Sequence, residues 1–134
     1  MVHLFPYWDF NEGQLIDLCA CTNAHSVELF VNGESLGRKV LDSAKSRTAN
    51  WQTPYHPGSV KVVAYDENGK VVATDEQDSF DDSAMVCLQA DRKTISGDGR
   101  ELAFITITTR DKNGNPVRNA NDRVTVRVNG AGVL

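Results

Sequence analysis

The segment at residues 26–41, SVELFVNGESLGRKVL, constrains the fold of this chain more than any other part of the sequence. Apolar residues occupy every second position from Val27 to Val31, which is the period of a β-strand with one buried face. Asn32-Gly33 follows at once, and this pair accepts the positive φ angles of a type I′ turn. Polar residues then lead into a second short strand, so the segment predicts a β-hairpin.

The same reading extends over the whole chain, because no segment shows a sustained 3.6-residue period. Turn sequences such as Asn11-Glu12-Gly13 and Pro57-Gly58 separate the apolar runs. The strands expected in the first part are 2–9, 14–22, 26–31, 35–41, 50–54, 59–65 and 71–77. Seven short strands at this spacing predict an all-β fold, an Ig-like antiparallel β-sandwich over residues 1–77.

An acidic stretch interrupts this pattern and predicts a linker at residues 78–84. Further strands are expected at 85–90, 102–110, 116–118 and 123–128, as the N-terminal part of a second Ig-like sandwich over residues 85–134. A complete domain of this class needs about seven strands, so the second sandwich is expected to be incomplete. Its open strand edges predict one of three outcomes: the second half packs on the first, swaps between copies, or forms a homodimer through residues 85–134.

Charge and hydropathy exclude two classes of partner. The net charge is −4, and the basic residues are scattered, whereas a nucleic-acid surface needs a basic patch. No apolar run approaches the roughly 20 residues of a membrane-spanning helix. The amino terminus lacks the basic and apolar segments of a secretory signal, which leaves the compartment open between cytoplasmic, periplasmic and secreted.

The sequence offers no catalytic, cofactor or metal constellation. The three cysteines are expected to be small buried hydrophobic residues, and Cys19 and Cys21 should point to the same side of a strand. The three histidines lie far apart, without the spacing of a metal site. Asp111-Lys-Asn-Gly-Asn115 resembles the start of a calcium loop, but Pro116 follows where the loop needs glycine, so a β-turn is expected.

Aromatic residues are the best candidates for a binding function. Exposed aromatic rings in sugar-binding modules stack against the C–H faces of carbohydrates. Tyr7, Trp8, Trp51 and Tyr55 are therefore the candidate sugar contacts. The alternative, which we favour, is that these side chains fill the core of the sandwich or its contact with another domain.

The amino-acid sequences of several segments resemble those of a known family. HLFPYWDF at residues 3–10, WQTPYHPGSVKVVAYDENGKVVAT at 51–74 and ADRKTISGDGRELAFITI at 90–107 resemble the regions that follow the catalytic barrel in bacterial, β-galactosidase-like enzymes of glycoside hydrolase family 2. The second half also resembles an invasin/intimin-type Ig-like repeat. The resemblance implies a parent enzyme that hydrolyses terminal β-galactosides or related β-glycosides with retention. It also implies a β-galactoside or related glycan as the ligand of the candidate aromatic contacts.

The resemblance does not extend to a catalytic site. The two catalytic carboxyl groups of this family lie on a barrel of about 250 residues, which a chain of 134 residues cannot contain. The family's catalytic residues have no matching positions here. The sequence therefore predicts a non-catalytic, C-terminal accessory fragment that supports the rest of the parent glycosidase or its oligomer. The alternatives are a carbohydrate-binding module and an adhesion-type Ig-like repeat.

Overall fold

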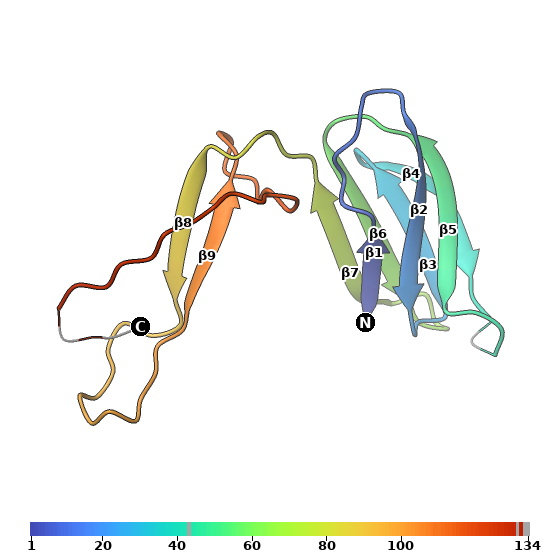
Figure 1. Ribbon diagram of the computed structural model, residues 1–134. Helices are drawn as coiled ribbons and strands as arrows, with labels where there is room; N and C mark the ends of the chain where they lie inside the picture. The colour runs from blue at the N-terminus through green and yellow to red at the C-terminus, as the bar shows by residue number, and fades with distance from the viewer. Residues whose placement is uncertain (43, 131, 133–134) are drawn as a thin grey trace. The chain divides into compact units, whose positions relative to one another are not determined.

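The computed structural model describes residues 1–42, 44–130 and 132. The chain forms two compact units, Met1–Asp81 and Asp82–Leu134. Every regular element in the described residues is a β-strand, and all strand pairs are antiparallel (Figure 1). The expected all-β fold class is confirmed. In the part of the chain that the structure describes, no helix is long and apolar enough to cross a membrane.

The first unit is a sandwich of two sheets. One sheet has three strands in the order β1-β2-β5, formed by β1 (Val2–Phe5), β2 (Leu15–Thr22) and β5 (Thr48–Pro54). The other has four strands in the order β4-β3-β6-β7, formed by β3 (Ser26–Val31), β4 (Glu34–Val40), β6 (Ser59–Tyr65) and β7 (Val71–Asp78). This arrangement matches the Ig-like sandwich expected from the strand spacing.

The core lies between these two sheets and follows the period-two pattern of the strands. On β3, Val27 and Leu29 are fully buried, and Glu28 between them is only half-buried. The buried hydrophobic cluster draws on five of the seven strands and two loop residues: Val2, Leu4, Trp8, Ile16, Leu18, Ala20, Val27, Leu29, Val31, Ala49, Trp51, Tyr55, Val60, Val62 and Ala64. Burial of this apolar surface is the main favourable term in the stability of the unit.

The hairpin expected at residues 26–41 is confirmed. β3 and β4 pair directly, and the turn between them has positive φ angles at Asn32 (49°) and Gly33 (85°). Two consecutive positive φ angles are the geometry that the Asn-Gly pair was expected to supply.

In its described residues, the second unit contains a single hairpin. β8 (Met85–Ala90) pairs with β9 (Ile105–Arg110) to form a two-stranded sheet. An isolated bridge joins Arg110 to Pro116. The last residues of the expected second domain, 131, 133 and 134, lie outside the described residues.

Several strand predictions were wrong in extent. β1 ends at Phe5 rather than at residue 9, because Pro6 has no N–H with which to continue the ladder. β5 begins at Thr48 rather than at residue 50, and β9 begins at Ile105 rather than at residue 102.

The strands expected at 116–118 and 123–128 do not form. Only the single bridge at Pro116 appears in the first segment, and the second belongs to no sheet. Val124, Val126 and Val128 alternate as in a strand, but each is exposed to solvent. Alternation predicts a face that is ready for burial, whereas a strand also needs a neighbour with which to form hydrogen bonds.

Candidate functional site

Two of the four candidate sugar contacts form one aromatic cluster in the core of the first unit. Trp8 and Tyr55 are buried, with ring centroids 4.8 Å apart. Trp8 Nε1 donates to the carbonyl oxygen of His56 at 3.0 Å, and the Tyr55 hydroxyl lies 2.8 Å from Ser79 Oγ. Both polar tips are therefore satisfied inside the fold, and neither ring presents a face to solvent.

Trp51 is also buried, and its Nε1 donates to the carbonyl oxygen of Gly37 at 3.3 Å. Tyr7 differs from the other three candidates because 51% of its surface is exposed. Three of the four aromatic candidates thus serve the core, which is the alternative that we favoured from the sequence. Sugar contact stays a prediction, for which Tyr7 offers the accessible ring.

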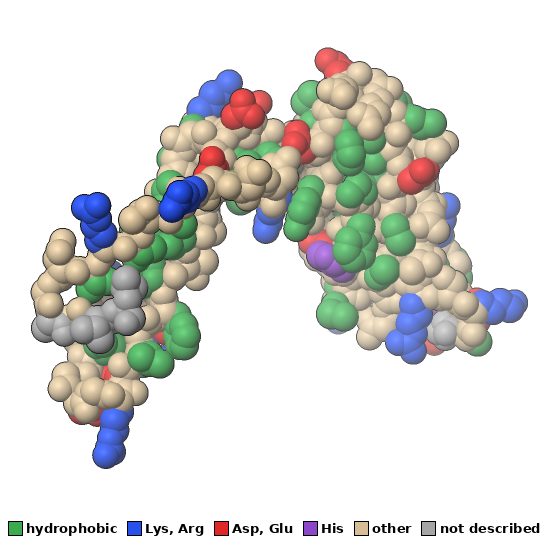
Figure 2. Space-filling view, viewed as in Figure 1, with side chains coloured by type: hydrophobic (Ala, Val, Ile, Leu, Met, Phe, Trp, Pro, Cys, Tyr) green, Lys and Arg blue, Asp and Glu red, His purple; other side chains and the backbone are tan. Residues whose placement is uncertain are grey.

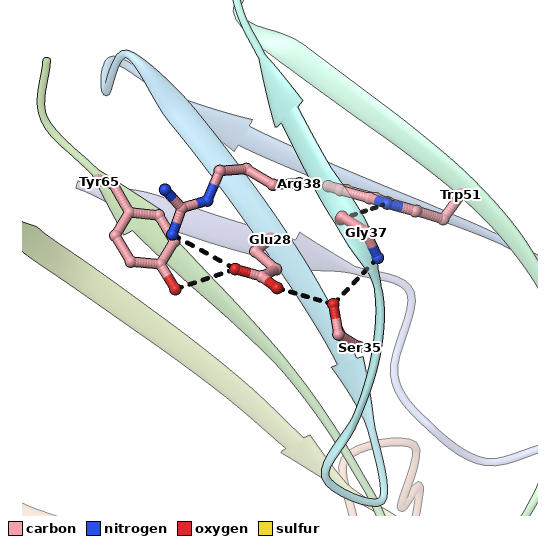
Figure 3. A network of polar contacts seen from close by, with 6 residues as sticks. All are labelled: Glu28, Ser35, Gly37, Arg38, Trp51 and Tyr65. Carbon is pink, nitrogen blue, oxygen red and sulfur yellow. Dashed lines mark hydrogen bonds and ion pairs between the residues drawn. The ribbon is translucent and has the colours of Figure 1, made fainter. Parts of the chain in front are cut away.

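A polar network lies on the outward side of the four-stranded sheet (Figure 3). Glu28 accepts hydrogen bonds from Ser35 Oγ at 2.7 Å and from the Tyr65 hydroxyl at 3.2 Å. It also pairs with Arg38 at 3.4 Å, and the Arg38 guanidinium lies 3.6 Å from the centroid of the Tyr65 ring. The network ties β3 to its neighbours β4 and β6 through side chains.

The hydrogen bond from Ser35 is the largest cause that lowers the pKa of Glu28, with smaller contributions from Tyr65 and Arg38 and an opposing effect of burial. A carboxyl group with a lowered pKa is a poor proton donor near neutral pH. The arrangement therefore supports the sheet and is poorly suited to acid catalysis.

Charged side chains of the four-stranded sheet block both edges of the three-stranded sheet. At the β1 edge, Asp75 on β7 accepts a hydrogen bond from the backbone N–H of Leu4 at 2.9 Å. At the β5 edge, Lys39 on β4 donates to the backbone carbonyl of Asn50. A carboxylate meets the free N–H and an ammonium meets the free C=O, so each edge loses a group that another chain would need for pairing. Sequence reasoning missed both contacts, since the partners lie 71 and 11 positions apart and no local pattern joins them.

The cysteines are free thiols, and the expectation that they are core residues was wrong. Cys19 and Cys21 are half-buried on the outward side of β2, because Leu18 and Ala20 take the inward positions. Burial and the neighbouring Cys21 thiol raise the pKa of Cys19, so this thiol stays protonated near neutral pH.

The β8–β9 hairpin of the second unit has one apolar side. Val86 and Leu88 lie on the same side as Ile105 and Ile107 in the observed register, and 69% of Leu88 is exposed. β8 pairs on one side only, with β9, and its sequence MVCLQA contains no charged residue and no proline. This edge lacks the protection found at the edges of the three-stranded sheet.

The loop that follows β9 is a turn. The buried Asp111 Oδ1 accepts from the backbone N–H groups of Asn113 at 2.9 Å and Asn115 at 2.8 Å. The expected β-turn is thereby confirmed. In the described residues, no group of three or more His, Cys, Asp or Glu side chains is arranged to hold a metal ion.

Comparison with known proteins relates both units to one kind of enzyme. Residues 13–73 match a family described as Domain of unknown function (DUF4982), and residues 86–134 match Glycoside hydrolase family 2 C-terminal domain 5. The chain is 40% identical over 135 aligned residues to β-galactosidase BoGH2A of Bacteroides ovatus, covering 100% of this chain and 16% of that protein. It is 37% identical over 76 residues to a putative β-glucuronidase of Formosa agariphila, covering 54% of this chain and 7% of that protein.

Comparison with solved structures also relates the chain to β-glycosidases. A β-glycosidase from Bacteroides vulgatus superposes with a TM-score of 0.77 and 35% identity, covering 86% of this chain and 15% of that one. The chain thus spans only about a sixth of the length of each of these two relatives, the β-galactosidase of Bacteroides ovatus and the β-glycosidase of Bacteroides vulgatus.

Proposed function

The chain is a non-catalytic C-terminal accessory region of the glycoside hydrolase family 2 type, and from this premise we propose that it supports the remainder of a larger β-glycosidase. The observation that carries this proposal is the burial of Trp8, Trp51 and Tyr55, with the polar tips of Trp8 and Tyr55 hydrogen-bonded inside the sandwich. A module built for sugar binding would present such rings to solvent. Here they stabilise a scaffold.

The parent enzyme is proposed to hydrolyse a terminal β-galactoside or a related β-glycoside with retention. The relatives carry two different sugar names, β-galactosidase and putative β-glucuronidase, so the proposal is made at the level of the β-glycosidic linkage. Its catalytic carboxyl groups would lie in the part of the parent outside this chain.

The test compares the complete glycosidase with a variant that lacks residues 1–134. We expect the variant to lose thermal stability or its native oligomeric state, because the surfaces that contact the accessory region become exposed to water. A variant that keeps the melting temperature, the oligomeric state and the turnover of the complete enzyme would contradict the supporting role. The isolated chain should not hydrolyse a chromogenic β-galactoside above a buffer blank.

The carbohydrate-binding alternative has its own test. Two-dimensional amide NMR of the 134-residue chain, titrated with galactose, lactose and longer β-galactosides, should show no saturable shifts at millimolar sugar. Saturable shifts localised around Tyr7 would instead support a binding module.

We also propose that isolated copies of the chain form a homodimer through the open strand edge of the second unit. The uncharged edge of β8 and the exposed apolar side formed by Val86, Leu88 and Ile105 support this proposal. Antiparallel pairing of β8 with its copy would satisfy the free backbone groups and extend the sheet. Sedimentation velocity should show a concentration-dependent dimer, and a strict monomer at the highest soluble concentration would contradict it.

A further inference from the structure

The two outward faces of the first unit differ in charge. The outward side of the four-stranded sheet carries ion pairs between Arg38 and Glu28 at 3.4 Å and between Lys61 and Glu76 at 3.6 Å. Exposed pairs of this kind are well solvated and contribute little to stability. This face therefore carries charges of both signs, beside the half-buried side chains of Phe30 and Val63.

The outward face of the three-stranded sheet has a different composition. In the observed register Phe5 lies opposite Cys19 and His3 opposite Cys21, so these four side chains form one patch across β1 and β2. Leu15 lies further along the same side of β2, and Phe5 and Leu15 are 44% and 60% exposed. The outward positions of the three strands, all within the described residues, include one carboxylate, Asp17, whose Oδ1 accepts from Gln52 Nε2 at 2.8 Å, and no Lys or Arg. Figure 2 shows hydrophobic side chains gathered over β1 and β2.

A face with exposed aromatic and aliphatic side chains and few charges has the composition of the centre of a protein interface. Its partner must contact the face itself, because Asp75 and Lys39 block backbone groups at the two edges of the sheet. Strand addition at these edges would first have to displace both charged side chains.

The share of the relatives that lies outside this chain indicates what covers the face. The chain matches 16% of one relative and 15% of another, so most of each relative's polypeptide is available to meet it. We propose that the outward face of the β1-β2-β5 sheet, centred on Phe5, Leu15, Cys19 and Cys21, is the surface through which the first unit docks onto another part of the same glycosidase polypeptide. This inference rests on the proposed supporting function and names the surface that performs it.

The two half-buried thiols provide a direct test. Cys19 and Cys21 are alkylated with iodoacetamide and Lys61 on the opposite face is acetylated, in the isolated chain and in the complete glycosidase, with rates read from peptide masses. Alkylation needs access to the thiol, so we expect both cysteines to react at least about tenfold more slowly in the complete enzyme. Lys61 should react at the same rate in both.

The other outcomes separate this inference from the function on which it rests. Slow acetylation of Lys61 with unchanged thiol reactivity overturns the choice of face and leaves the supporting function in place. Unchanged rates at all three residues overturn the inference, because neither face of the first unit would then be covered; the deletion of residues 1–134 decides the supporting function separately. Equal slowing on both faces also overturns the choice of face, since the protection would not be specific to β1 and β2.

A pair of variants adds a second readout. Leu15→Glu places a charge in the proposed surface, and Leu36→Glu places the same charge on β4, where the native leucine is also exposed. Both isolated variants should unfold like the original chain, because neither leucine belongs to the core cluster. In the complete enzyme, Leu15→Glu should restore rapid alkylation of Cys19 and Cys21, and Leu36→Glu should not. Protection that survives Leu15→Glu would overturn the inference.

Discussion

Replacement of Gly58 by alanine should destabilise the first unit more than any other single methyl group added at a glycine. Gly58 has φ of +132°, and a Cβ built there would lie 1.9 Å from Asn32 Oδ1. That oxygen accepts the backbone N–H of Ser59 at 2.9 Å, and the Asn32 amide donates to the carbonyl of Pro57 at 3.1 Å. The methyl group must therefore displace the amide and break both hydrogen bonds.

The magnitude follows from these contacts. A non-glycine residue in the left-handed region costs about 1–2 kcal/mol. Two lost hydrogen bonds add about 1 kcal/mol each. The free energy of unfolding should fall by about 3–4 kcal/mol, a large share of the roughly 5–15 kcal/mol typical of a domain. Gly69→Ala is the matched control, because Gly69 has φ of +78° and no atom within 4 Å of the added carbon, so only the backbone cost of about 1–2 kcal/mol applies.

Denaturant unfolding followed by tryptophan fluorescence measures both losses, because the chain's two tryptophans, Trp8 and Trp51, lie in the first unit. The collision also predicts non-additivity. In an Asn32→Ala background the oxygen is gone, so Gly58→Ala should cost only about as much as Gly69→Ala. Equal losses for the two glycine variants in the original background would refute the reasoning.

Three further predictions follow from the polar contacts and the open edge. Asp75→Ala should lower the free energy of unfolding by about 1.5 kcal/mol in the same assay, because the backbone N–H of Leu4 loses its charged acceptor; an unchanged value would show that water replaces the carboxylate. The pKa of Glu28 is lowered from its ordinary 4.5, so its stabilising contribution is present above that pH and is lost as the pH falls below it. Glu28→Gln should therefore reduce the drop in the free energy of unfolding between pH 6 and pH 3. An identical drop in both proteins would contradict this linkage. Leu88→Lys should abolish the dimer in sedimentation velocity without altering the unfolding of the first unit, since this side chain is already exposed, and a dimer that persists would exclude the β8 face from the contact.

The strand pattern of the first unit was predictable because burial on one side imposes alternation on the sequence. The alternation of Val27, Leu29 and Val31 predicts a strand with one buried side, and Asn32-Gly33 predicts the turn that follows it. Both patterns are local, so they can be interpreted without knowledge of the neighbouring strands. The same alternation misled at residues 123–128, because it carries no information on whether a neighbouring strand is present.

The contacts that define the surfaces were not predictable. In the sequence, Asp75 and Lys39 look like ordinary charged surface residues. Only the packing of one sheet on the other brings them to the edges of β1 and β5. The aromatic residues present the opposite difficulty. Tyr7 and Trp8 are adjacent aromatic residues with similar chemistry, yet Trp8 is buried and Tyr7 is half exposed. The sequence does not predict this difference, because strand β1 and its hydrogen bonds to β2 end at Phe5.

The two units expose backbone edges in different ways, and this difference indicates how each would contact its surroundings. Asp75 and Lys39 hydrogen-bond to backbone groups at the two edges of the three-stranded sheet, so the addition of further strands is disfavoured there. A partner of this sheet must therefore contact its outward face. The hairpin of the second unit has an uncharged edge at β8 and an apolar side that no strand among the described residues of this unit covers. A two-stranded sheet is marginally stable in water, so additional strands should stabilise this unit far more than the first. Face contact by the first unit and strand pairing by the second are therefore separable, and Leu15→Glu should leave the dimerisation of the chain unchanged.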